Sequence, residues 1–148
     1  PSTTLFRSGQ QLVSTQTEFG SAGLAICYDL RFPEIFRHYA DVPVDFTFLV
    51  AEWPLPRIEH WRTLIRARAI ENQCYMLACN RVGTDANNTF FGHSMVVDPW
   101  GEILLEADDS EGIFAVEVDT ASIRAARAKI PVLTDRRKEL YEGGRGNN

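Results

Sequence analysis

The feature that most constrains this chain is a cysteine placed between a short uncharged run and the start of a helix. The run Gly23-Leu24-Ala25-Ile26 predicts a buried strand. Pro33 suits the first position of a helix because its missing N–H would have no partner there, and Glu34 puts negative charge at the positive end of the helix dipole. Cys27 is therefore expected at a strand-to-helix junction.

A junction of this kind favours thiol chemistry. A thiol close to a helix N-terminus has its thiolate stabilised, and the thiolate is the nucleophilic form. The backbone N–H of Tyr28 is free in such a turn and is placed to hold the oxyanion that forms when a carbonyl is attacked. The alternative is that Cys27 is a small core hydrophobe, because free cysteine is among the most buried residue types.

The order of the elements predicts a layered α/β protein. A helix is expected over 33–40 and a strand over 44–51, which would lie parallel to the strand before Cys27 through a right-handed crossover. The clearest helix covers 57–73, where apolar residues recur at helical spacing. The further elements expected are strands over 75–79, 90–97, 102–106 and 113–118, a polar loop over 80–88, a turn at Pro99-Trp100-Gly101, and a helix over 121–129 capped by Thr120.

Two residues that follow the predicted 44–51 strand are candidate pocket residues. In open α/β sheets, ligands gather beyond the carboxyl ends of the strands. Glu52 and Trp53 are therefore expected on the same rim as Cys27. The alternative for Trp53 is that it only packs the loop against the core.

Arg31 has two interpretations. It pairs with Asp29 or Glu34 and braces the turn, which is the favoured interpretation, or it lines the pocket and clamps a substrate carboxylate, for which a planar guanidinium is suited. A second charged pair, Arg68 and Glu71, is three residues apart on the predicted long helix and is expected to be structural.

Composition limits the classes of function. The chain has 148 residues with a formal net charge of −5, which fits one domain or part of one and gives no indication of nucleic-acid or membrane-surface binding. No apolar run approaches the roughly 20 residues of a membrane-spanning helix. The three cysteines have no framework spacing, which favours a reducing, cytoplasmic setting. The histidines do not cluster with the cysteines, so neither a metal site nor a cofactor is expected.

Three stretches, in order, resemble motifs of the nitrilase superfamily, the carbon-nitrogen hydrolases. Cys-Tyr-Asp-Leu-Arg-Phe-Pro-Glu, which begins at Cys27, resembles the nucleophile motif, most closely that of the branch containing omega-amidases and Nit proteins. His60-Trp61 with residues 66–73 and 80–83 resembles the next segment of the family, and Asp-Pro-Trp-Gly-Glu at 98–102 resembles its hairpin turn.

The resemblance implies a fold and an activity. The fold is a four-layer α-β-β-α sandwich, usually dimerised, with C-terminal arms that cross to the partner. Residues 1–131 would be a partial carbon-nitrogen hydrolase domain, and 132–148 a C-terminal arm or disordered tail. The activity is hydrolysis of a small carboxylated amide to acid and ammonia through a cysteine thioester, with Cys27 as the nucleophile. A carboxylated substrate agrees with Arg31 as a clamp, and Glu52 and Trp53 are the further candidate substrate-binding residues by their place in the sheet.

Two further catalytic residues of the family have no counterpart here. In the family a glutamate acts as general base and a lysine assists, and both precede the cysteine. Before Cys27 the only acidic residue is Glu18, and there is no lysine. The chain is therefore expected to be the C-terminal part of a subunit that is inactive alone and forms a cytoplasmic homodimer when complete.

Other functions stay open. The parent could hydrolyse nitriles or carbamoyl groups or transfer an acyl group, or the chain could be a non-catalytic nitrilase-fold module for binding or assembly. A Cys–His hydrolase would need His38, His60 or His93 as its base. His38 falls in the helix after the turn, His60 opens the long helix, and His93 falls in a predicted strand, so a structural or surface role is expected for each.

Overall fold

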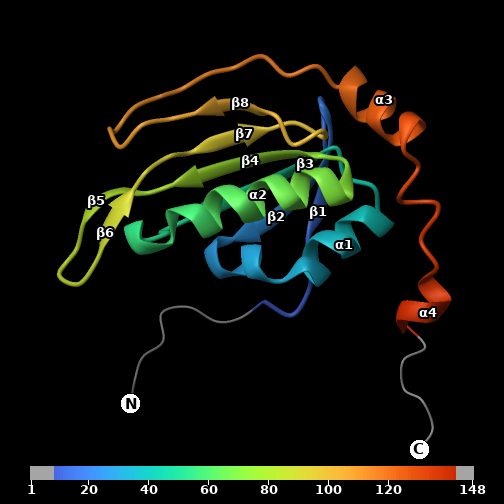
Figure 1. Ribbon diagram of the computed structural model, residues 1–148, viewed down its shortest axis with the longest axis horizontal. Helices are drawn as coiled ribbons and strands as arrows, with labels where there is room; N and C mark the ends of the chain where they lie inside the picture. The colour runs from blue at the N-terminus through green and yellow to red at the C-terminus, as the bar shows by residue number, and fades with distance from the viewer. Residues whose placement is uncertain (1–8, 143–148) are drawn as a thin grey trace, which may run out of the picture.

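The computed structural model describes residues 9–142, which are organised around a six-stranded mixed sheet (Figure 1). The strands lie in the order β1-β2-β3-β4-β7-β8, and the helices α1 (Pro33–Asp41) and α2 (Ile58–Asn72) cover one face. The strand bounds are β1 Ser14–Thr17, β2 Gly20–Ile26, β3 Phe46–Ala51, β4 Tyr75–Asn80, β7 Met95–Val97 and β8 Ile103–Glu106.

The predicted parallel unit is confirmed. β2 pairs with β3 and β3 pairs with β4, both in parallel, with Ile26 opposite Val50 and Val50 opposite Cys79. The helices α1 and α2 agree with the predicted helices over 33–40 and 57–73 to within one residue at each end. Because β2, β3 and β4 are parallel, their carboxyl ends meet at one edge of the sheet.

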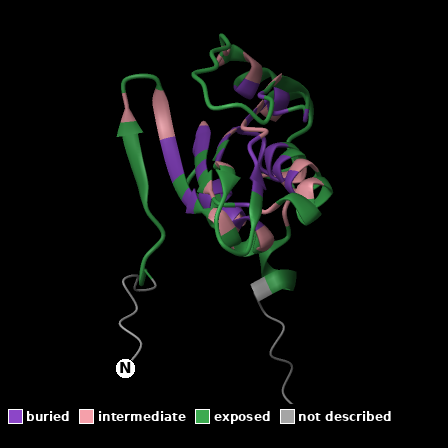
Figure 2. Ribbon diagram, turned by 90° about the vertical axis from the view of Figure 1, so that its left-hand side faces the viewer, coloured by how far each residue is buried: buried purple, intermediate pink, exposed green. Residues whose placement is uncertain are grey.

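The main core lies between the sheet and the two helices. Phe36 of α1 and Trp61 and Ile65 of α2 are buried against Leu49 of β3 and Met76 of β4. In Figure 2 the buried positions gather between the sheet and the helices, whereas β1 is exposed along most of its length. The helices and the sheet each bury one apolar face at this contact, and that burial stabilises the packing of the two layers.

The opposite face of the sheet is largely uncovered within the described chain. Strand alternation places four apolar side chains on it, which are 40 to 66% exposed and which we call the open sheet face: Leu24, Ile26, Phe48 and Val50. The helix α3 (Ala121–Lys129) packs against one end of this side of the sheet, where Ile123 is buried with Phe46 and Tyr75.

Two predicted strands are wrong. Residues 113–118, although described, form no strand, and Ile113 is fully exposed, because an alternating pattern gives a strand only where a neighbour accepts its hydrogen bonds. The single strand predicted over 90–97 is divided into β6 (Thr89–Phe91) and β7. Gly92 and His93, between them, have left-handed backbone conformations with φ of 67° and 53°, which a strand cannot contain.

Two smaller predictions are also corrected. The predicted polar loop over 80–88 contains β5 (Val82–Thr84), which pairs with β6 as a two-stranded ribbon. Thr120 does not cap α3 through its side chain, because its own backbone is already helical, with φ −63° and ψ −18°. The Asp119 carboxylate accepts the hydrogen bond from the Ala121 N–H instead, at 2.8 Å.

The chain after residue 131 folds back onto α1. The Asp41 carboxylate at the end of α1 pairs with Arg136 at 2.6 Å and with Lys138, the first residue of α4 (Lys138–Glu142), at 2.7 Å. The hydrogen bond from Lys138 and the nearby Arg136 charge hold the pKa of Asp41 below its usual range. The rest of the predicted arm, 143–148, lies outside the described residues, and the boundary at residue 131 stays a prediction.

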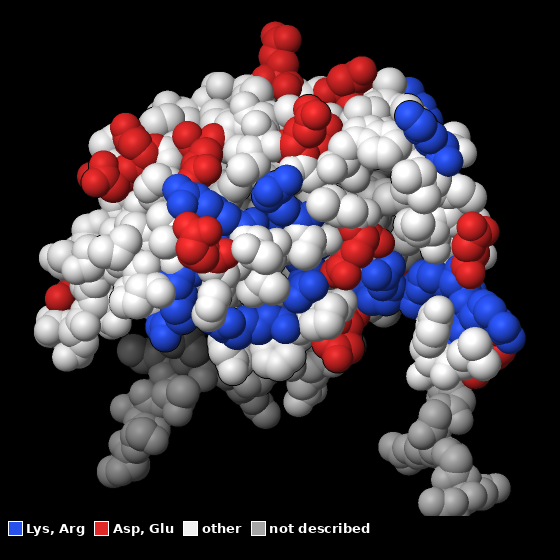
Figure 3. Space-filling view, in the orientation of Figure 1, with Lys and Arg blue, Asp and Glu red and all other residues white. Residues whose placement is uncertain are grey.

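Basic and acidic side chains are interspersed on the face that α1 and α2 cover (Figure 3). Arg62 pairs with Glu59 at 3.1 Å and with Glu106 at 2.7 Å, and Arg68 pairs with Glu71 at 2.9 Å as predicted. The charges on this face are therefore largely paired with one another. No helix within residues 9–142 has the length and apolar character needed to cross a membrane.

Cys74 gives a prediction for the pH dependence of stability. Burial raises the pKa of its thiol from 9.0 to about 11. Between these values the unfolded chain has lost a proton that the folded chain keeps, so the free energy of unfolding should fall as the pH rises from about 9 towards 11. The fall in the free energy of unfolding that is attributable to Cys74 approaches about 2 kcal/mol.

Urea unfolding at about pH 8 and at about pH 10.5 tests this. The free energy of unfolding should fall more between these pH values in the natural chain than in Cys74→Ala. An equal loss in the two proteins would contradict this, and the exposed Cys79→Ala should behave as the natural chain does.

Candidate active site

Cys27 lies where β2 ends and a turn of 3-10 helix, η1 (Cys27–Arg31), begins. Its φ is 44°, in the left-handed region that residues other than glycine rarely adopt. Such a conformation costs about 1–3 kcal/mol and persists only where the surroundings impose it. The strand-to-helix junction predicted from the sequence is thus present, in the form of a short helix turn before α1, and Cys27 occupies its strained position.

The turn is held by contacts on both sides of Cys27. On one side, the Asp29 carboxylate accepts a hydrogen bond from the Ile26 N–H at 2.8 Å. On the other, the buried guanidinium of Arg68 donates to the Leu30 carbonyl from Nη2 at 2.9 Å and from Nε at 3.3 Å. The long helix α2 therefore fixes the turn that carries the cysteine.

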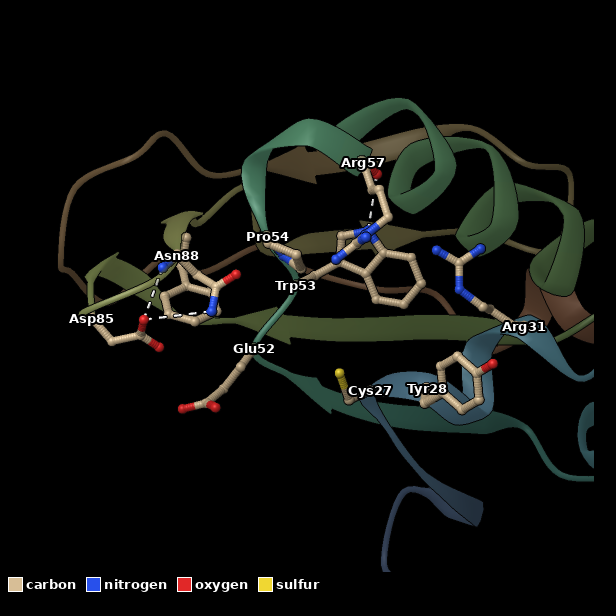
Figure 4. A pocket seen from close by; sticks show the side chains of 10 residues that line it. Cys27, Tyr28, Arg31, Glu52, Trp53, Pro54, Arg57, Asp85 and Asn88 are labelled. Carbon is tan, nitrogen blue, oxygen red and sulfur yellow. Dashed lines mark hydrogen bonds between the residues drawn. The ribbon is translucent and has the colours of Figure 1, made fainter.

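Cys27 opens into a pocket of about 410 Å³ at the carboxyl edge of the parallel strands (Figure 4). Three segments line it, namely η1, the loop after β3 and the β5–β6 ribbon. The lining residues are Cys27, Tyr28, Arg31, Glu52, Trp53, Pro54, Arg57, Asp85, Asn88 and Phe90. The structure therefore brings together all five residues that the sequence suggested, and in Figure 4 the Cys27 sulfur points toward the space beside Glu52 and Trp53.

Trp53 forms the buried wall of the pocket. Its side chain is 3% exposed, and its ring packs on Trp61 of the core with centroids 5.7 Å apart. Its indole Nε1 donates to the Arg57 carbonyl at 2.9 Å. The guanidinium of Arg31 lies over the Trp53 ring, with its central carbon 4.7 Å from the ring centroid. Trp53 thus packs the loop against the core and also supports a cation inside the pocket.

The favoured interpretation of Arg31 as a brace of the turn is wrong. Within the described residues Arg31 forms no ion pair with Asp29 or Glu34, because Asp29 bonds the Ile26 N–H and Glu34 lies at the start of α1. Arg31 instead stacks on Trp53, with its Nη2 3.5 Å from Nδ1 of His60.

The part of the pocket from Glu52 to the β5–β6 ribbon is acidic and polar. Glu52 pairs with Arg81 at 2.9 Å, and the Arg81 guanidinium stacks on Phe90 at 4.5 Å. Asp85 accepts hydrogen bonds from the backbone N–H groups of Asn87 and Asn88, which lower the pKa of its carboxyl. The sequence predicted Glu52 here but missed Asp85 and Asn88, although the polar turn over 85–88 follows a parallel strand and so falls at the same edge.

None of the three histidines lines the pocket. His38 is exposed on α1, and His60 is exposed on α2 and reaches only Arg31. His93 lies between β6 and β7, not within a strand, and its Nδ1 is 2.7 Å from the Glu106 carboxylate. A Cys–His arrangement around Cys27 is therefore absent from the described residues.

Fold and site together define an α/β protein that presents a strained cysteine to a pocket of small-molecule size. A family model described as carbon-nitrogen hydrolase matches residues 2–128. The chain therefore belongs to the carbon-nitrogen hydrolase family, and its mixed sheet with flanking helices is part of the nitrilase fold.

Relatives match this chain over part of their own length. The chain is 50% identical over 121 residues to the 2-oxoglutaramate amidase of Bacillus subtilis, a match that covers 82% of this chain and 46% of that protein. Among the solved structures, the NitFhit protein of C. elegans superposes on this chain with a TM-score of 0.87 and is 36% identical to it. The match covers 91% of this chain and 34% of the NitFhit chain. This chain thus spans about half the length of the amidase it matches.

One solved relative has a modified cysteine. An amidase mutant from Nesterenkonia sp. AN1 has a TM-score of 0.81 and 27% identity, over 94% of this chain and 50% of its own. It shows covalent addition of the acetamide moiety of fluoroacetamide at its active-site cysteine.

Proposed function

We propose that this chain supplies the nucleophile and the substrate pocket of a thiol amidohydrolase that cleaves a small carboxylated amide to acid and ammonia, as an omega-amidase does. The observation that carries the proposal is the placement of Cys27, in a strained conformation, at a pocket that also contains the Arg31 guanidinium. The likeness to a 2-oxoglutaramate amidase and the covalent adduct in the Nesterenkonia amidase support the same reaction class.

In the proposed reaction the Cys27 sulfur attacks the amide carbonyl and a C–S bond forms. The N–H of Tyr28 donates to the resulting oxyanion, since the second residue of a helix has no acceptor inside that helix. The general base takes the thiol proton and passes it to the amide nitrogen, ammonia leaves as the carbonyl re-forms, and water hydrolyses the thioester to release the acid and the thiol. The general base and a second cation come from a glutamate and a lysine outside these 148 residues. The two lysines present contact Trp100 and Asp41, away from the pocket.

The carboxylate of the substrate is proposed to bind Arg31. A guanidinium presents a planar fork of N–H donors that matches a carboxylate, and the Trp53 ring beneath it limits where the fork can lie. Glu52 and Trp53 form the wall next to the Cys27 sulfur. This arrangement favours a molecule with a carboxylate at one end and an amide within reach of the sulfur.

The complete subunit is proposed to be a four-layer α-β-β-α sandwich that forms a cytoplasmic homodimer. The uncovered apolar side chains of the open sheet face support a second sheet on that side. The extent of the match to the Bacillus amidase supports further residues in the subunit.

Two alkylating agents that differ in charge test the pocket. With iodoacetate and iodoacetamide the step is the same, because the thiolate displaces iodide and an S–C bond replaces the C–I bond. Only iodoacetate carries a carboxylate. Peptide mass spectrometry measures both rates at Cys27 and at Cys79, which is exposed outside the pocket. The ratio of the iodoacetate rate to the iodoacetamide rate should be about three to five times higher at Cys27 than at Cys79.

Arg31→Gln should bring the ratio at Cys27 down to that at Cys79. Arg66→Gln is the matched control, because Arg66 lies outside the pocket and bonds the Gly101 carbonyl. A natural chain in which the two cysteines give equal ratios would contradict the proposed carboxylate site.

A further inference from the structure

The side chain of Asn80 connects two walls of the pocket without lining it. Asn80 is the last residue of β4 and is 5% exposed. Its Oδ1 accepts a hydrogen bond from the Trp53 N–H at 2.7 Å, and its Nδ2 donates to the Trp53 carbonyl at 3.2 Å. The same Nδ2 donates to the Gly92 carbonyl at 2.8 Å. One buried amide thus holds the loop after β3 and the end of the β5–β6 ribbon.

The chemistry of this position requires an amide. The side chain of asparagine offers one acceptor and two donors in one plane, and all three are used here. Toward Trp53 it behaves as another peptide group would, since it accepts from the N–H and donates to the C=O of the same residue. A side chain without these groups would leave three backbone groups buried and unpaired.

The two segments that Asn80 joins also touch each other. Pro54, next to Trp53, forms an isolated β-bridge with Phe90, which lies two residues before Gly92. Both Pro54 and Phe90 line the pocket. A displacement at Asn80 would therefore move the Trp53 wall and the ribbon wall together.

Trp53 in turn determines the position of the Arg31 guanidinium. The Arg31 guanidinium lies 4.7 Å from the Trp53 ring centroid, and its only other polar neighbour among the described residues is His60 Nδ1 at 3.5 Å. With so few polar contacts of its own, Arg31 takes its position from the ring on which it stacks.

We propose that Asn80 is a positioning residue that fixes the width of the pocket and, through Trp53, directs Arg31 toward the substrate carboxylate. It touches neither the substrate nor the reacting sulfur. The inference rests on the proposed function in that it takes the pocket around Cys27 to be the site of a carboxylated molecule.

The test measures the same reagent ratio at Cys27 in Asn80→Ala and Asn80→Ser. Both substitutions are neutral, so the net charge near the pocket does not change. The preference for iodoacetate at Cys27 relative to Cys79 should fall about three- to fivefold, to the value of Arg31→Gln. The matched control is Asn87→Ala, an exposed asparagine of the ribbon turn that does not line the pocket.

Cys74 reports whether the variants are folded. Its side chain is 2% exposed, so it is alkylated only when the chain opens. A variant in which Cys27 loses its preference for iodoacetate, while Cys74 is still not alkylated, would support the positioning role of Asn80.

Three different results would overturn the inference. If the preference for iodoacetate at Cys27 survives both substitutions, the positioning role of Asn80 is contradicted and the carboxylate pocket is not. Alkylation of Cys74 in both variants would show that Asn80 serves folding rather than positioning. A natural chain without any preference at Cys27 would contradict the carboxylate pocket of the proposed function, whatever the variants do.

Discussion

Replacement of Cys27 by alanine is expected to abolish ammonia release from succinamate in an enzyme that contains this chain. The loss should be at least about ten-thousand-fold, because the covalent path needs the sulfur. A suitable enzyme is a chimaera in which the chain replaces the matched segment of the Bacillus 2-oxoglutaramate amidase, to which it is 50% identical over 121 residues. The remaining part of the amidase then supplies the glutamate and the lysine that we propose to lie outside these 148 residues. An assay coupled to glutamate dehydrogenase measures the rate of ammonia release.

Two controls accompany this measurement. Arg66→Gln changes a residue outside the pocket that bonds the Gly101 carbonyl, and it should leave the rate of the chimaera unchanged. The isolated chain should release no ammonia in a single-turnover assay with succinamate. Ammonia from the isolated chain would show that the base lies within these 148 residues, and an active Cys27→Ala chimaera would refute the nucleophile.

Replacement of Trp61 by alanine is expected to lower the free energy of unfolding by about 3–5 kcal/mol. Trp61 is fully buried, and its ring packs against Trp53 at 5.7 Å and Phe91 at 6.4 Å. Its indole N–H also donates to the His93 carbonyl at 2.9 Å, in the segment with left-handed backbone. The substitution therefore leaves both a large cavity and an unpaired carbonyl. Urea unfolding followed by far-ultraviolet circular dichroism measures the change.

A second variant keeps part of the packing. Trp61→Phe retains one aromatic ring but loses the N–H donor and some ring volume, so its cost should be about 1–3 kcal/mol, below that of Trp61→Ala. Trp100→Ala is the matched control, because Trp100 is 40% exposed at a hairpin turn, and its cost should stay below about 1 kcal/mol. A cost below about 1 kcal/mol for Trp61→Ala would show that the aromatic cluster is not the centre of the core.

The elements built on local patterns were predictable from the sequence. Pro33 and Glu34 mark the start of α1, and helical spacing marks α2. The parallel pairing of β2 and β3 followed from the helix between them. In the same way, the rule that sites lie at the carboxyl ends of parallel strands brought Cys27, Glu52 and Trp53 together.

What could not be predicted depends on contacts between distant residues. The segment 113–118 has a strand pattern, but a pattern does not reveal whether a partner strand is present. Arg31 has carboxylates close by in the sequence, yet it stacks on Trp53, because a ring 22 positions away offers it a flat surface. Asn80 gave no signal as a link between walls, because its three partners belong to backbone groups at residues 53 and 92.

The open sheet face has a consequence for the chemistry on the other side of the same strand. Ile26, the last residue of β2, belongs to the open sheet face, while the next residue, Cys27, begins η1 with a left-handed backbone and faces the pocket. A partner bound at Ile26 would restrict the motion of the peptide bond between Ile26 and Cys27. The open sheet face and the pocket are thus adjacent along the chain, separated by the single peptide bond between Ile26 and Cys27.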